Sequence, residues 1–117
     1  FRSEISGAVT EETRIAYVKG KIPSPGRICE LLKKYPNLYG DISAGSGYHA
    51  LASDPVFGAS FLEQFQDKLL FGTDTCHYEG SHGDILVFLN ESLGKGLISE
   101  KAYTKITEKN GRKLLKL

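Results

Sequence analysis

Hydrophobic side chains recur at helical spacing in four parts of the chain. Apolar residues three or four positions apart predict helices over about 25–35, 55–66, 83–93 and 99–109. One face of the third helix gathers Ile85, Phe88, Leu89 and Ser92. Each of these helices therefore has an apolar stripe that must pack against another element.

Capping signals mark the starts of three of these helices. Ser24 stands before Pro25, and the run Ser53–Pro55 repeats the order of a polar cap followed by proline. Ser99 is placed to cap the last helix. The sequence thus predicts that the first two helices begin at their prolines and that the last begins just after Ser99.

Two short segments have the pattern of strands. Residues 37–43 are rich in strand formers, and residues 68–74 form an apolar run that ends in small and polar residues. Gly45–Gly47 reads as a glycine-rich loop, and the Asn-Gly pair at 110–111 predicts a break after the last long helix. Residues 1–24 are expected to be loop with at most one turn of helix.

The alternation of helices and strands predicts an α/β fold with parallel strands. Two parallel strands alone cannot cover the apolar stripes of four helices, and both edges of such a sheet stay unpaired. We therefore expect the chain to be the end of a larger α/β sheet or barrel. An upstream portion of the same protein is the expected companion.

Composition excludes several functional classes. The 117 residues are 40% hydrophobic and 25% charged with a net charge of +1, so nucleic acid and anionic membranes are not expected partners. No apolar run approaches the roughly 20 residues of a membrane helix. Cys29 and Cys76 are expected to be thiols, and the chain contains no Met. These features predict a soluble, cytoplasmic protein and a piece of a longer chain.

Candidate chemistry lies where the two strands end. Asp74 follows the buried run, where parallel α/β folds place ligand sites, so it is a candidate metal ligand or general base. The alternative is an Asp that only caps the turn after the strand. Asp41 and Ser43 share one side of the other strand. A structural role for Asp41, in which it pairs with a neighbouring basic residue or accepts loop amides, is the favoured interpretation.

Several other polar residues lie in the loops after these strands. Cys76, His77 and His82 follow Asp74 closely, but their spacing matches no established zinc pattern, so metal ligation is the less favoured interpretation. Tyr48, His49 and His77 are candidate substrate-binding residues. No dinucleotide fingerprint is present, and a nucleotide site is not expected.

Three segments carry a family resemblance: Lys34–Ala44 (KYPNLYGDISA), Asp67–Asp74 (DKLLFGTD) and Ile106–Leu115, which ends in NGRKLL. Together they resemble the end of the amidohydrolase superfamily, in its amidohydrolase-2 branch. The resemblance implies that residues 1–117 are the C-terminal fragment of one (β/α)8 barrel domain, with strands seven and eight and their flanking helices. The first segment corresponds to strand seven and the second to strand eight.

The resemblance also implies a metal-dependent hydrolase that acts on a small-molecule substrate. In that family a divalent metal, usually zinc, lies at the barrel mouth, and the strand-eight aspartate binds the metal or activates its water. Asp74 matches this aspartate and is the expected catalytic residue and metal ligand. The same architecture supports decarboxylation, which remains an alternative.

The chain departs from the family pattern in its histidines. The His-x-His of strand one and the histidines of strands five and six have no counterpart, so most metal ligands are expected upstream of Phe1. The fragment alone is expected to be inactive and to need the upstream part of the barrel. A homo-oligomer is left open, and a non-catalytic α/β interaction module is the alternative from another class.

Overall fold

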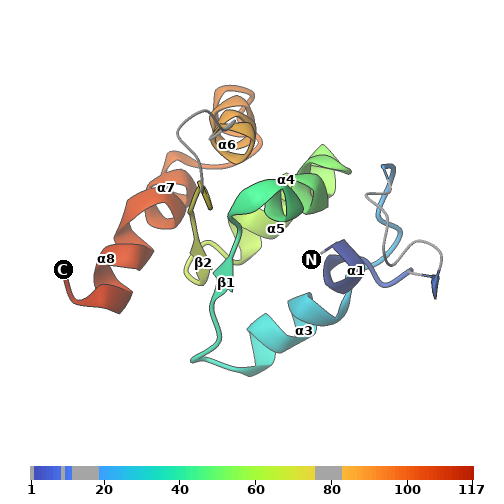
Figure 1. Cartoon of the computed structure of the whole chain (residues 1–117), viewed down its shortest axis with the longest axis horizontal. Coiled ribbons are helices and arrows are strands. Elements are labelled where there is room, and N and C mark those ends of the chain that lie inside the picture. Colours follow the sequence, from blue (N-terminus) through green and yellow to red (C-terminus); the bar gives the residue numbers. More distant parts are fainter. Residues whose placement is uncertain (1, 9, 12–18, 76–82) are drawn as a thin grey trace.

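The computed structural model describes residues 2–8, 10–11, 19–75 and 83–117 (Figure 1). Helices and two short parallel strands alternate along the described chain. In order, the elements are α1 (Arg2–Ile5), α3 (Arg27–Lys34), β1 (Gly40–Asp41), α4 (Ala44–Ala52), α5 (Pro55–Gln64), β2 (Leu69–Leu70), α6 (Asp84–Gly94), α7 (Glu100–Thr104), η1 (Lys105–Lys109) and α8 (Asn110–Leu115). The prediction of an α/β chain with parallel strands is confirmed.

The two strands form the sheet of the described chain. They are parallel, with Gly40 opposite Leu69 and Asp41 opposite Leu70. Helices α4 and α5 lie on one side of the strand pair and α7 and α8 on the other (Figure 1). The strands are much shorter than the predicted 37–43 and 68–74, because the flanking residues have no further strand to pair with among the described residues.

A single apolar cluster joins the helices to the strands. Ile42, Leu51, Leu62, Leu69 and Leu89 are fully buried in it. The predicted face of α6 is confirmed, since its buried residues are Ile85, Phe88, Leu89 and Ser92. The Cys29 thiol is also buried, and this burial raises its pKa. No helix among the described residues is long and apolar enough to cross a membrane.

The predicted helix starts are correct for α5 and α7 and wrong for α3. Asp54 caps α5, with Pro55 at the first helical position, and the Ser99 hydroxyl accepts the amide of Ala102 at 3.1 Å. Helix α3 instead begins after Gly26. Pro25 takes part in a bridge to Ser6, so contacts with the N-terminal segment override the local capping signal.

The glycine-rich stretch after β1 forms the first turns of α4, and the prediction of a loop at Gly45–Gly47 was wrong. Gly47 is buried against the backbone of Ile42, and a Cβ atom at this position would clash with the Ile42 carbonyl. The glycine that lowers helix propensity therefore allows α4 to pack closely against the end of β1.

The C-terminal helix continues through the Asn-Gly pair, and the predicted break at 110–111 was wrong. The chain is helical from Glu100 to Leu115, with a π-helical segment at Lys105–Lys109. Asn110 is buried, and its side-chain amide donates to the carbonyls of Gln66 and Leu69 at 2.7 and 2.8 Å. These long-range hydrogen bonds offset the weak helix propensity of the pair.

The carboxylates of Asp54 and Glu63 link the starts of α5 and α7 to residues that are distant in the sequence. Asp54 accepts the amides of Ile22 at 2.8 Å and Phe57 at 3.2 Å. Glu63 accepts both the amide and the hydroxyl of Ser99 at 2.9 Å. The Ile22 amide holds the pKa of Asp54 below its ordinary value, and the Ser99 amide does the same for the pKa of Glu63.

These lowered pKa values predict a loss of stability in acid. The stabilisation is complete above the ordinary carboxyl pKa of about 4 and is lost as pH falls through the lowered pKa values. We expect the double variant Asp54→Asn, Glu63→Gln to be less stable at neutral pH and to lose less stability between pH 7 and pH 3. Urea unfolding of the parent and the double variant across this pH range measures the free energy of unfolding. The same change with pH in both proteins would contradict the prediction.

Candidate functional site at the strand ends

The carboxyl ends of β1 and β2 lie next to each other. Because the strands are parallel and in register, residues 42–44 and 71–74 leave the sheet at the same edge. Gly72 packs against the other strand end: a Cβ placed on it would lie 3.1 Å from the Ser43 Cβ and 3.7 Å from the Asp41 carboxylate. The structure therefore brings together the two polar strand ends that the sequence singled out.

Asp41 has the structural role that the sequence favoured. Its Oδ1 accepts the backbone amide of Ser43 at 2.8 Å, which closes a tight turn at the end of β1. One carboxylate oxygen thus holds the chain where it leaves the strand and enters α4.

Asp74 lies just beyond β2 on exposed backbone. It has a φ of 55°, and Ala44 at the other strand end has a φ of 63°. A positive φ is unusual for a residue other than glycine, and such conformations cluster at functional sites. Both strand ends thus leave the sheet through strained backbone. Asp74 is exposed in the described structure, although it follows a strand with a buried residue.

Tyr48 and His49, two candidate substrate-binding residues, lie on α4. Their rings are in edge contact, with centroids 5.1 Å apart. Tyr48 is partly buried against the apolar core and lines a cavity of about 180 Å³ with Phe88 and Ser92 of α6. His77, the third candidate, lies outside the described residues, as do Cys76 and His82.

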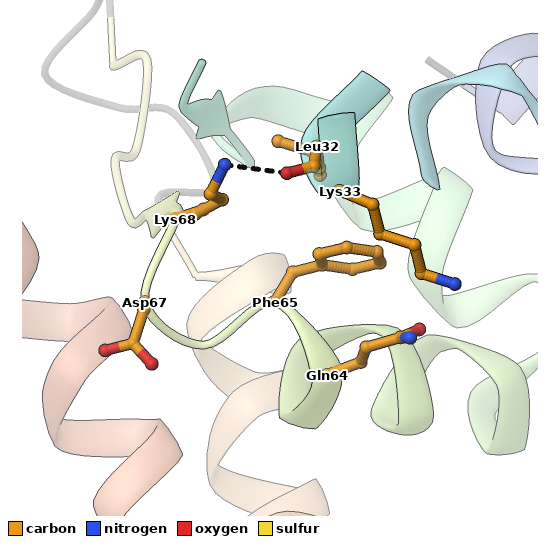
Figure 2. A pocket seen from close by; sticks show the side chains of 6 residues that line it. All are labelled: Leu32, Lys33, Gln64, Phe65, Asp67 and Lys68. Carbon is orange, nitrogen blue, oxygen red and sulfur yellow. Dashed lines mark hydrogen bonds between the residues drawn. The ribbon is translucent and has the colours of Figure 1, made fainter. Parts of the chain in front are cut away.

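A pocket of about 330 Å³ lies at the start of β2 rather than at its carboxyl end (Figure 2). Its lining residues are Leu32, Lys33, Gln64, Phe65, Asp67 and Lys68. The Lys68 amine turns toward the end of α3 and donates to the Leu32 carbonyl at 2.7 Å and the Tyr35 carbonyl at 2.5 Å. This lysine caps a helix, and the pocket lies at the end of β2 opposite to Asp74.

The described residues do not form a metal site by themselves. Among them, no group of three or more His, Cys, Asp or Glu side chains is close enough to bind one ion. Asp74 therefore does not belong to a group of three or more such side chains among the described residues. A structural metal site usually needs four ligands, and a catalytic zinc site needs three from the protein.

Sequence reasoning missed the contact between Asn110 and the strand that leads to the site. The Asn110 side chain donates to carbonyls in β2 and in the turn before it. The only signal was an Asn in the middle of an otherwise helical pattern, which is typical of a helix end as well. Its partners lie 41 and 44 residues away in the sequence, so no local pattern could reveal them.

Comparison with known proteins identifies the family. A family model described as amidohydrolase matches residues 12–117. No curated protein and no solved structure gives a significant match. The family comprises hydrolase-type enzymes that act on small molecules and generally use divalent metal ions. Because the match covers most of the chain, the protein belongs to the amidohydrolase superfamily, in its amidohydrolase-2 branch.

Proposed function

We propose that this chain is the C-terminal part of a metal-dependent hydrolase and that Asp74 is its catalytic aspartate. The observation that carries the proposal is the position of Asp74: it follows the carboxyl end of a parallel strand, on strained backbone, in a chain of the amidohydrolase family. The substrate class is a small molecule with an ester, lactone or amide bond.

In this proposal β1 and β2 are strands seven and eight of a (β/α)8 barrel, and an upstream part of the same protein supplies the others. Exposed leucines at the C-terminal end of the described chain support it, because Leu114, Leu115 and Leu117 are 45%, 67% and 80% exposed. A groove of about 260 Å³ between the C-terminal helix and β2 is lined by Leu70, Phe71 and two of these leucines. Apolar surface of this kind is typical of an interface that another element covers.

Asp74 would act as a general base toward the attacking water. Its carboxylate takes a proton as the water oxygen bonds to the substrate carbonyl carbon, and it gives that proton to the leaving oxygen or nitrogen as the old bond breaks. Asp74 is exposed at the strand ends, so solvent has access to this residue. Asp74 would also be one ligand of the metal ion. Since the described residues hold no complete metal site, the other ligands would come from other parts of the protein.

Incubation of the full-length protein with p-nitrophenyl acetate, γ-butyrolactone and acetanilide tests this function. We expect hydrolysis of at least one of the three, and we expect it to fall after treatment with a chelator. Release of carbon dioxide from benzoic or cinnamic acid without any hydrolysis would instead assign a decarboxylase. A protein that folds cooperatively, contains no metal and catalyses neither reaction would be an interaction module.

A further inference from the structure

The outer edge of β2 is bonded to the C-terminal helix. Lys68 and Leu70 turn their carbonyls toward β1, where they accept the amides of Gly40 at 2.8 Å and Ile42 at 3.0 Å. Alternate residues of a strand direct their backbone groups to opposite edges. The Leu69 carbonyl and the Phe71 amide therefore face away from β1. The Leu69 carbonyl accepts from the Asn110 side chain, and the Phe71 amide donates to the Ile106 carbonyl at 3.1 Å.

The π-helical segment positions the Asn110 side chain and the Ile106 carbonyl for these two hydrogen bonds. In an α-helix the Asn110 amide would donate to the Ile106 carbonyl, but here it donates to the Lys105 carbonyl. The Ile106 carbonyl accepts from Phe71 instead. The Ile106 side chain is 1% exposed, so packing holds the same turn in place. The π-helical segment and the residue after it thus bind two nearby backbone groups on the outer edge of the strand, the Leu69 carbonyl and the Phe71 amide.

The side-chain amide of Asn110 is suited to bind two carbonyl groups at once. Its side-chain nitrogen carries two hydrogens, and the structure uses it for two carbonyls, one in the turn before β2 and one in the strand. Aspartate has nearly the same shape but, when ionised, has only acceptors and would face two carbonyl oxygens. Alanine leaves both carbonyls without this partner in a buried place.

We propose that Asn110 is a positioning residue for Asp74, an inference that rests on the function proposed above. The two contacts made by the helix fix β2 at Leu69 and Phe71, shortly before the chain reaches Asp74. A strand that slides or tilts at these points moves the Asp74 carboxylate relative to the substrate. A displacement of about 1 Å at a reacting group is enough to cost roughly 100-fold in rate.

The test uses the full-length protein and the most rapidly hydrolysed of the three compounds named above. The variants are Asn110→Ala, Asn110→Gln and Asp74→Asn. Asn90→Ala is the matched control, because Asn90 also makes a side-chain hydrogen bond, to the Tyr103 hydroxyl at 2.8 Å, but on an exposed surface. Asn110→Gln keeps the two donor hydrogens on a longer side chain, so it displaces the contacts without removing them.

We expect kcat to fall about 10- to 100-fold in both Asn110 variants, with KM within about twofold of the parent value. Asn90→Ala should keep the parent kcat. Backbone hydrogen exchange gives a readout independent of activity: the Phe71 amide should exchange at least about tenfold faster in Asn110→Ala and at the parent rate in Asn90→Ala.

Two outcomes separate the possible failures. If Asp74→Asn loses activity while Asn110→Gln, folded at the assay temperature, keeps the parent kcat, the positioning role is wrong and the proposed function stands. If Asp74→Asn keeps the parent activity, the proposed function is wrong and the positioning role fails with it.

Discussion

Replacing Asp74 with asparagine in the full-length protein is expected to lower the rate of hydrolysis by about 100- to 10,000-fold. The amide cannot take a proton from the attacking water, although it has nearly the same size and can keep the same backbone conformation. Asparagine tolerates a positive φ as well as aspartate does, so the value of 55° at this position is no obstacle to folding. Steady-state rates and a thermal melt of the same preparation measure both effects.

Asp41→Asn is the matched control for this substitution. It makes the same chemical change at the neighbouring strand end. The asparagine retains an oxygen that can accept the Ser43 amide, which is the contact that Asp41 makes. We expect this variant to keep the parent rate. Equal losses of rate in the two variants would mean that the loss is not specific to Asp74. A normal rate in Asp74→Asn would refute its catalytic role.

Substitution of Leu69 by alanine is expected to lower the free energy of unfolding by about 2–5 kcal/mol. Leu69 is fully buried in the strand that leads to Asp74. Truncation removes apolar contacts and leaves a cavity between the sheet and the helices that cover it. Urea unfolding monitored by circular dichroism gives the difference.

Val56→Ala is the control for this loss. Its side chain on α5 is 73% exposed, and an exposed substitution of this kind changes stability by no more than about 0.5 kcal/mol. A similar change in both variants would show that Leu69 is not a core residue.

The helices were predictable where local signals agree with the packing. In α6 the apolar spacing alone identified the buried face, because the face that is apolar in sequence is the one that the core covers. The Asp54 cap and the following proline likewise placed the start of α5, since a side-chain cap depends only on neighbouring residues.

The wrong predictions share a physical cause. Gly47 looked like a loop residue, but the backbone of Ile42 needs the space that its missing side chain leaves. Asn110 looked like a helix end, but its donors serve carbonyls far away in the sequence. In each case a contact with a residue outside the helix overrides a local preference of about 1 kcal/mol or less.

The candidate site was predictable in position but not in environment. The apolar run that ends at Asp74 indicated where the carboxylate leaves the sheet. Its exposure depends on which other elements cover that edge, and a strand pattern contains no information about them. Tyr48 similarly lines a cavity together with residues of α6, which lie far away in the sequence, whereas the contact of Asp41 is two residues away and was predictable.

The metal content of the full-length protein tests the central claim most directly. The measurement is elemental analysis of the purified parent protein beside its Asp74→Asn variant, after both are dialysed against metal-free buffer. If Asp74 is a ligand in a metal-dependent hydrolase, the parent retains about one divalent ion or more per chain, zinc foremost, and the variant retains clearly less. Equal metal content in the two proteins, or an active parent without metal, would contradict the account.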